Sequence, residues 1–108
     1  MDEKDSAENR SALNVRIRFF GAIRAAVGSA EVETESPVGC TVYGLLKILS
    51  VNYGDSFREE VFQQPGDEPR DDLIVLINGL NTGREQLINA VINDGDVIAL
   101  MQTFPGGG

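Results

Sequence analysis

The end of the sequence is the stretch whose residue types point most directly to chemistry. Residues 104–108 read FPGGG and follow an apolar run at 97–101 that is typical of a strand. Glycine has no side chain, so this backbone is thin and adopts conformations closed to other residues. Its one reactive group is the α-carboxylate of Gly108. The tail therefore suits insertion into a narrow site on another protein, and the alternative is a frayed terminus without a role.

Composition excludes several classes of function. The chain carries 17 acidic and 9 basic residues, a net charge of −8, whereas nucleic-acid binding needs clustered Lys and Arg. One cysteine, Cys40, and no histidine leave no disulfide within the chain and remove the usual ligands of zinc and the usual catalytic base. No apolar run is long enough to cross a membrane, and the first residues lack a secretory signal. We therefore expect a cytoplasmic monomer that binds no nucleic acid, membrane, metal or cofactor.

Two stretches near the start alternate apolar and polar residues, as half-buried strands do. In residues 30–35 three glutamates share one face, which is typical of a solvated edge strand. Residues 21–28, between the two stretches, form an Ala-rich helical turn or a wide loop. In residues 15–19 the pattern places Val15, Ile17 and Phe19 in the core, and Arg16, Arg18 and Phe20 on the opposite face.

One amphipathic helix is predicted in the middle of the chain. Its apolar stripe has the spacing i, i+3, i+4 and i+7, with Thr41 as the residue that caps its start and Gly54 as the residue that ends it. Gly44 lies in the first turns, where a close approach to a sheet would explain it. Cys40 is predicted to be a small buried apolar residue, with a thiolate at the helix start as the alternative. The stripe consists of Val42, Leu45, Leu46 and Leu49.

The second half of the chain supplies the remaining elements. The continuous apolar run at 73–77 predicts a well-buried strand, and Asn78-Gly79 predicts a tight turn after it. Residues 84–93 have no clear period, and Leu87, Ile88, Val91 and Ile92 are their apolar anchors. The other expected elements are a helical turn at 56–62, an acidic surface loop at 63–72, a short returning strand at 80–82, a turn at 94–96 and a last strand at 97–101.

The order of these elements predicts an α+β fold, with one main helix laid across one face of a mixed sheet. The expected domain covers residues 14–103. An acidic tail at 1–13 is too poor in apolar residues to fold, and the tail at 104–108 follows the domain. The second face of the sheet stays uncovered and is available to a partner.

The segments of this chain resemble the ubiquitin-like β-grasp proteins of the sulfur-carrier group. That group includes the small subunit of molybdopterin synthase, the thiamine-pathway sulfur carrier and the small archaeal modifier proteins. Molybdopterin-type relatives end in Pro-Pro-Val-x-Gly-Gly, whereas this chain has a single proline and a third glycine there. The resemblance therefore implies C-terminal activation more than molybdopterin synthesis in particular. The similar segments are VRIRFFGAIRAAVG, GCTVYGLLKIL, LIVLINGLN, INDGDVIALM and the terminal diglycine.

The resemblance implies that the chain is a substrate and carrier rather than an enzyme. A ubiquitin-activating-type enzyme would use ATP to adenylate Gly108, while Gly107 and Gly106 give the tail clearance. The carboxylate would then become a thiocarboxylate that delivers sulfur to molybdopterin or a tRNA base, or would be joined to lysines of target proteins. Expected partners are the adenylating enzyme and a sulfur-acceptor enzyme or modified proteins. The alternative is a ubiquitin-like interaction domain with an inert tail.

We expect the docking surface for such partners on the uncovered sheet face near the tail. Phe20, Met101 and Phe104 are its predicted contact residues, and a role in the core is the alternative for the first two. In the last strand, Ile98 and Leu100 are predicted to face the helix instead. The chain has two lysines, Lys4 and Lys47, and Lys4 is the expected acceptor if the protein modifies itself.

Overall fold

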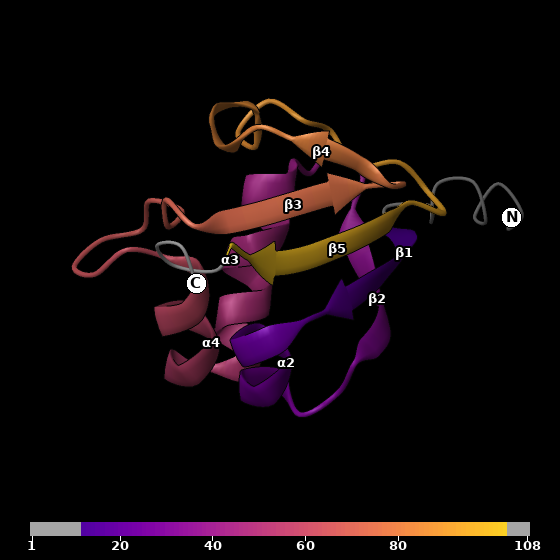
Figure 1. Cartoon of the computed structure of the whole chain (residues 1–108). Coiled ribbons are helices and arrows are strands. Elements are labelled where there is room, and N and C mark those ends of the chain that lie inside the picture. Colours follow the sequence, from indigo (N-terminus) through magenta and orange to yellow (C-terminus); the bar gives the residue numbers. More distant parts are fainter. Residues whose placement is uncertain (1–11, 104–108) are drawn as a thin grey trace, which may run out of the picture.

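The computed structural model describes residues 12–103, apart from the side chain of Arg84, and shows one mixed sheet with helices on one face (Figure 1). The five strands lie in the order β2-β1-β5-β3-β4. β1 and β5 are parallel neighbours, and the other neighbouring pairs are antiparallel. The strands are β1 (Ala12–Phe19), β2 (Glu31–Pro37), β3 (Leu73–Ile77), β4 (Leu80–Thr82) and β5 (Val97–Gln102).

The predicted main helix is α3 (Val42–Tyr53), which crosses behind the sheet in Figure 1. Two shorter helices, α2 (Gly21–Val27) and α4 (Asp55–Val61), pack against each other, and α4 also packs against α3. A short 3-10 helix, η1 (Arg84–Gln86), follows β4. The α+β prediction is therefore confirmed, with α2 as a formed helix rather than a loop.

Alternation along the strands separates a buried sheet face from an open one. Ile17 of β1 lies beside Ile98 of β5, and Phe19 lies beside Leu100; all four are almost fully buried against the helices. This confirms that Ile98 and Leu100 face the helical layer. All four predicted stripe residues of α3, together with Phe57 and Val61 of α4, complete the same core.

The first backbone N–H groups of α3 are satisfied by one side-chain acceptor and two backbone acceptors. The Thr41 hydroxyl accepts a hydrogen bond from the Gly44 N–H at 3.1 Å, as the capping prediction requires. The carbonyls of Leu87 and Ala90 accept from the next free N–H groups, those of Tyr43 and Val42, at 3.0 and 2.9 Å. The segment after β4 is therefore tied to the helix start.

A close approach to the sheet does not explain Gly44, because within 4 Å a Cβ atom there would meet only atoms of Cys40 and Thr41. A Cβ atom at this position would lie 3.0 Å from the Cys40 sulfur, and no sheet atom is nearer. Cys40 itself is only half-buried, and its thiol donates to the Thr41 carbonyl at 3.2 Å. The small residue at the helix start therefore makes room for the cysteine before it.

Three further sequence predictions need correction. β3 is less buried than the predicted well-buried strand, because Ile74 and Leu76 lie on the open face and are half-buried. Ile88 and Val91 are 61% and 53% exposed, because their segment is a 3-10 turn and loop that directs other residues inward. β1 begins at Ala12, two residues before the expected start of the domain at 14, because it pairs with the end of β2. Residues 1–11 lie outside the described part of the chain.

Candidate functional site

The described residues nearest to the predicted reactive tail are Gln102 and Thr103, here called the tail root. Phe104 and the three glycines, Gly106, Gly107 and Gly108, lie outside the described residues. β5, which leads into them, runs through the sheet between β1 and β3. Any tail that follows β5 therefore starts from a strand held on both edges.

Two contacts fix the last described residues. The Thr103 N–H donates to the Asp72 carbonyl at 2.9 Å. The Gln102 side-chain amide donates to the Glu60 carbonyl at 2.9 Å and to the Glu60 carboxylate at 3.0 Å. Gln102 thus joins the end of β5 to α4, and Thr103 joins it to the loop before β3. These contacts fix the position of the last described residues, from which the tail continues.

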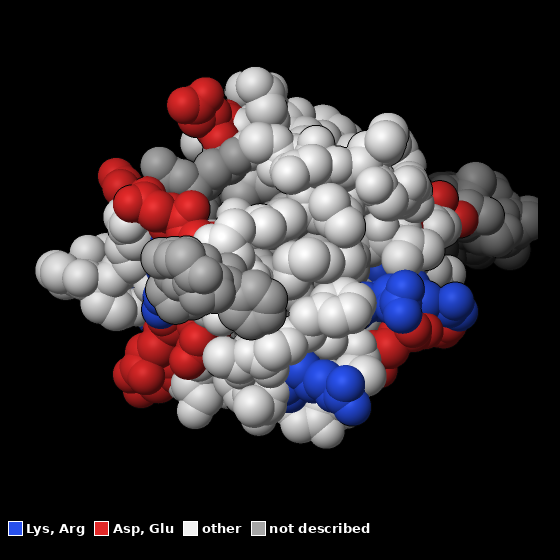
Figure 2. Space-filling model, in the orientation of Figure 1, with Lys and Arg blue, Asp and Glu red and all other residues white. Residues whose placement is uncertain are grey.

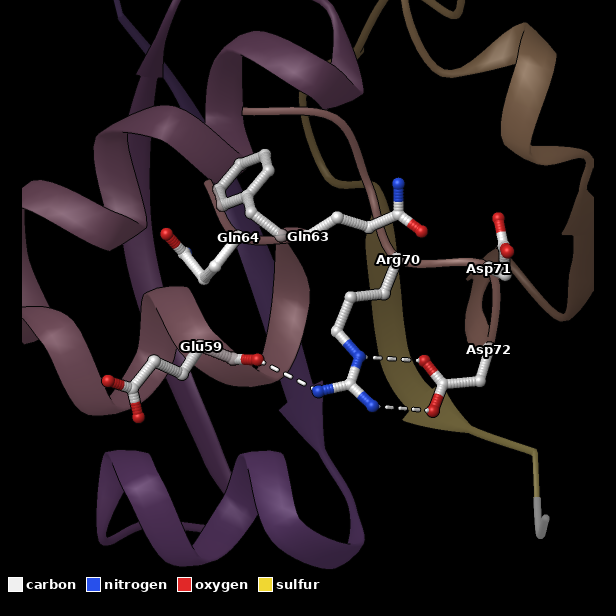
Figure 3. Close-up of a pocket in the computed structure, with 7 residues that line it drawn as sticks. Glu59, Gln63, Gln64, Arg70, Asp71 and Asp72 are labelled. Atoms are coloured by element: carbon white, nitrogen blue, oxygen red, sulfur yellow. Dashed lines mark hydrogen bonds and ion pairs between the residues drawn. The ribbon is translucent and has the colours of Figure 1, made fainter. Parts of the chain in front are cut away.

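A depression of about 480 Å³ lies beside this root, with Arg70 across its base (Figure 3). The Arg70 guanidinium donates to both carboxylate oxygens of Asp72 at 3.0 Å and to the Glu59 carbonyl at 2.9 Å. The hydrogen bond to Asp72 raises the pKa of Arg70. Arg70 therefore ties α4 to the residue whose carbonyl holds Thr103, a link that the sequence did not predict because it joins three separate segments.

The open face of the sheet lies beside the tail root. Phe20 is 38% exposed, and Met101 is half-buried opposite Ile74. The alternative of a core role for Phe20 and Met101 is thus not what the structure shows. Figure 2 shows this face with uncharged residues over its centre, and with Lys and Arg gathered where β1 and β2 lie. The apolar part, here called the open-face patch, consists of Phe20, Ile74, Leu76, Ala99 and Met101.

Ion pairs at the edge keep the arginines away from the centre of the open face. Arg16 lies 3.0 Å from the Glu31 carboxylate and 2.7 Å from that of Glu33. The hydrogen bond that Arg16 donates to Glu33, together with the charge of Glu31, raises the pKa of Arg16. Arg18 lies 3.6 Å from Glu31 and 5.6 Å from the centre of the Phe20 ring. These exposed pairs add little stability, but they direct Arg16 toward β2, so that among the β1 cations only Arg18 lies against the open-face patch, over the Phe20 ring.

The sequence model of the ThiS family matches residues 17–107, nearly the whole described domain and most of the glycine end. The chain belongs to the ThiS family. Members of this family are ubiquitin-like sulfur carriers with the β-grasp fold, as the resemblance implied. No curated protein sequence matches the chain at a significant level.

Solved structures of several other proteins have the same fold as this ThiS-family domain. SAMP1 of Haloferax volcanii is 23% identical, with a TM-score of 0.74 over 87% of this chain and 99% of that one. Urm1 of Trypanosoma brucei is 22% identical, with a TM-score of 0.70 over 89% and 97%. A Pyrococcus furiosus protein assigned as molybdopterin converting factor subunit 1 is 27% identical, with a TM-score of 0.67 over 85% and 99%. These likenesses confirm the fold.

A carboxylate clasp holds the beginning of β5 in this ThiS-family chain. Asp96 is almost fully buried and accepts hydrogen bonds from the Asn78 side chain at 2.9 Å and from the Asn93 N–H at 2.8 Å. The Asn78 side-chain oxygen accepts in turn from the Val97 N–H at 3.0 Å. The sequence predicted one turn at Asn78-Gly79 and another at residues 94–96, where an aspartate lies on either side of Gly95. It did not predict that the two turns are joined. The clasp therefore fixes β5 at Val97, the end of the strand that lies opposite the tail.

The loop at 63–72 lies on the surface, as predicted, and it is also fastened to the helices, which the sequence did not predict. The Asp67 carboxylate accepts from Lys47 at 2.7 Å and from Arg58 at 2.8 Å. The Tyr43 hydroxyl donates to the Asp67 carbonyl at 2.9 Å. The hydrogen bond from Lys47 is the largest cause that lowers the pKa of Asp67, and Arg58 adds to it. Lys47 is consequently engaged in an ion pair.

The described residues form neither a metal site nor a membrane-spanning helix. Within residues 12–103, no three His, Cys, Asp or Glu side chains lie close enough together to hold a metal ion. No helix in the same range has the length and apolar character needed to cross a membrane.

Proposed function

We propose that this ThiS-family chain is a carrier whose Gly108 carboxylate is adenylated by a ubiquitin-activating-type enzyme. The observation that carries the proposal is the family match, which extends through Gly107 into the glycine end. The fold supports it, because β5 leads from the centre of the sheet directly toward that end. Family members act as carriers, so the chain supplies a substrate group rather than a catalytic one.

The proposed chemistry needs activation because a carboxylate is a poor electrophile. The Gly108 carboxylate attacks the α-phosphorus of ATP, pyrophosphate leaves, and a mixed anhydride with AMP forms. A sulfide equivalent or an amine then attacks the carbonyl carbon and AMP leaves. Sulfide gives a thiocarboxylate for sulfur transfer, and a lysine amine gives an amide on a target protein. ATP is used by the enzyme and is not a resident cofactor of this chain.

The glycine tail provides reach and clearance for this reaction. Residues 104–108 span about 15 Å when extended, which takes the carboxylate away from the bulk of the domain. Side chains on Gly106 and Gly107 would narrow the choice of backbone conformations in a tight channel. We therefore assign clearance to these two glycines and the reacting carboxylate to Gly108.

The docking surface is proposed to be the open-face patch together with Phe104 of the tail. The patch is apolar, uncovered and next to the tail root, so an enzyme that receives the tail meets it directly. We expect Phe104→Ala to weaken activation and leave the urea midpoint of unfolding unchanged, because the residue follows the last strand. A Phe104→Ala protein that unfolds early would contradict this assignment.

Sulfur transfer and protein modification differ in what becomes attached to Gly108. Lys47 is held by Asp67, which leaves Lys4 as the preferred acceptor if the chain modifies itself. An inert tail is the remaining alternative, and deletion of Gly107 and Gly108 distinguishes it, because only a reactive tail loses its function on deletion.

Intact mass is the measurement that tests the proposal. The chain is incubated with ATP, the adenylating enzyme of its own host and a sulfide source, beside a matched chain that lacks Gly107 and Gly108. Exchange of one oxygen for sulfur in the full chain alone supports the carrier role. In a parallel incubation with host protein extract, amide linkage of Gly108 to host lysines, without that exchange, supports protein modification. A full chain that reacts no more than the shortened one refutes the proposal.

A further inference from the structure

A groove of about 500 Å³ lies on the helix side of the domain, away from the open-face patch. β3 and β4 are antiparallel, so the loop before β3 and the segment after β4 meet at one end of the hairpin, next to the start of α3 (Figure 1). None of the described residues that line the groove belongs to a strand. The helix-side groove is lined by Tyr43, Asp67, Glu68, Pro69, Glu85, Leu87 and Ile88.

The groove has a fixed apolar floor. The Tyr43 ring packs edge-to-face on Phe62, with ring centres 6.1 Å apart, and its hydroxyl donates to the Asp67 carbonyl. Leu87 is almost fully buried, and its carbonyl accepts from the Tyr43 N–H at 3.0 Å. These contacts hold the floor in one arrangement before any partner arrives, which lowers the entropic cost of binding.

Ile88 is the apolar residue that the fold leaves unexplained. It is 61% exposed at the groove, while its neighbour Leu87 is almost fully buried. A single exposed isoleucine is ordinary on a protein surface. Here it stands at the edge of an apolar floor inside a concave site, which is where anchoring contacts of an interface are found.

The rim of the groove is acidic. Among the described lining residues, the charged ones are Asp67, Glu68 and Glu85. Asp67 is neutralised by Lys47 and Arg58. The carboxylates of Glu68 and Glu85 form no ion pair or hydrogen bond with any residue that the structure describes. Two negative charges that no described residue neutralises therefore flank the apolar floor.

We propose that the helix-side groove binds a short segment of a partner protein in which one or two adjacent apolar side chains are flanked by Lys or Arg. An apolar side chain packs on Tyr43 and Ile88, which the buried Leu87 supports from below, and the cations lie against Glu68 and Glu85. Charge complementarity selects this occupant, because an acidic segment is repelled by the same rim. The groove shares no described residue with the open-face patch or the tail root, so this partner binds while the tail is occupied.

A nuclear magnetic resonance titration tests the groove. The full ¹⁵N-labelled chain is titrated with the capped peptide acetyl-Lys-Lys-Leu-Leu-Lys-Lys-amide at low salt. We expect the largest amide shifts at Tyr43, in residues 67–69 and in residues 85–88. A peptide with serine in place of both leucines, and one with glutamate in place of the lysines, are each expected to bind at least about fivefold more weakly, because they lose packing and charge pairing respectively.

Matched variants separate the groove from general attraction to an acidic protein. Glu68→Gln with Glu85→Gln is expected to raise the Kd at least about fivefold, and Ile88→Ala is expected to raise it likewise. Glu31→Gln with Glu33→Gln removes the same charge on β2, and Val51→Ala shortens an exposed apolar residue on α3; both are expected to bind as the unchanged chain does. Their amide spectra confirm that each variant is folded.

Three results would overturn the proposal. They are the absence of saturable binding, amide shifts concentrated on the open-face patch, and equal losses in the groove variants and the β2 control. The titration contains no ATP or activating enzyme, so its outcome is independent of whether Gly108 is adenylated.

Discussion

The contact that joins the end of β5 to α4 leads to a prediction about how the tail is presented. Gln102→Ala removes the two hydrogen bonds that its amide donates to Glu60, at 2.9 and 3.0 Å. The variant keeps the backbone pairing of β5 but releases the last residue of the strand from the helix. We expect the domain to remain folded and the start of the tail to become less ordered.

The size of the effect follows from the conformational entropy that the enzyme must remove when it orders the released residue on binding. Ordering the backbone of one residue costs about 1–2 kcal/mol. Since about 1.4 kcal/mol changes an equilibrium tenfold, an enzyme that reorders one residue binds the variant about 5- to 30-fold more weakly. Once the tail is seated, the reacting carboxylate is unchanged. The loss is therefore expected in KM and not in kcat.

The assay is exchange of pyrophosphate into ATP by the host's adenylating enzyme, measured at increasing concentrations of each chain. Gln64→Ala is the matched control, because that glutamine lines the neighbouring depression and its side chain forms no hydrogen bond with the described residues. Urea unfolding of both variants separates presentation of the tail from loss of the fold. An unchanged KM for Gln102→Ala, or a fall in kcat alone, refutes the reasoning.

Three further predictions concern the domain that presents the tail. Thr41→Ala is expected to lower the free energy of unfolding by about 1 kcal/mol in urea, because the Gly44 N–H loses its cap, and an unchanged midpoint would contradict the capping role. Gly44→Ala is expected to stabilise the domain by about 1 kcal/mol only when Cys40 is also alanine, because the new Cβ otherwise meets the sulfur; equal effects in both backgrounds would show that the sulfur yields freely. Asp67→Asn is expected to lower the thermal midpoint at neutral pH. The pKa of Asp67 is lowered by folding, so its contribution is present above the unfolded pKa and lost as pH falls through the folded pKa. The two proteins should therefore converge in acid, and a constant difference between them would rule out the ion pairs as the cause.

Local patterns were sufficient for most of the architecture. Alternation placed Ile17 and Phe19 on the buried face, and the helical stripe with its Thr41 cap and Gly54 end placed α3. These signals depend on neighbours in sequence, whose geometry is fixed by the strand or helix itself. The order of the elements then predicted a helix across one face of a mixed sheet, and the family resemblance supplied the expected role of the tail.

Contacts between distant segments were beyond the reach of those patterns. Nothing near Asp96 in sequence indicates that Asn78 will donate to its carboxylate, and Asp67 lies 20 residues from Lys47. Ile88 looked like a core residue because apolar residues usually are. Whether such a residue turns inward depends on how the loop crosses the helix start, which is decided by the whole fold.

The position of β5 between β1 and β3 has a consequence for synthesis of the protein. Without β5 the sheet consists only of the β1–β2 and β3–β4 hairpins, with no strand to connect them. A nascent chain therefore cannot complete the domain until residues up to Gln102 have emerged from the ribosome. A chain cut short by translational arrest or proteolysis loses its folded scaffold and its carboxyl end together. An adenylating enzyme that requires both the folded domain and the carboxyl end would thus not react with such shortened chains.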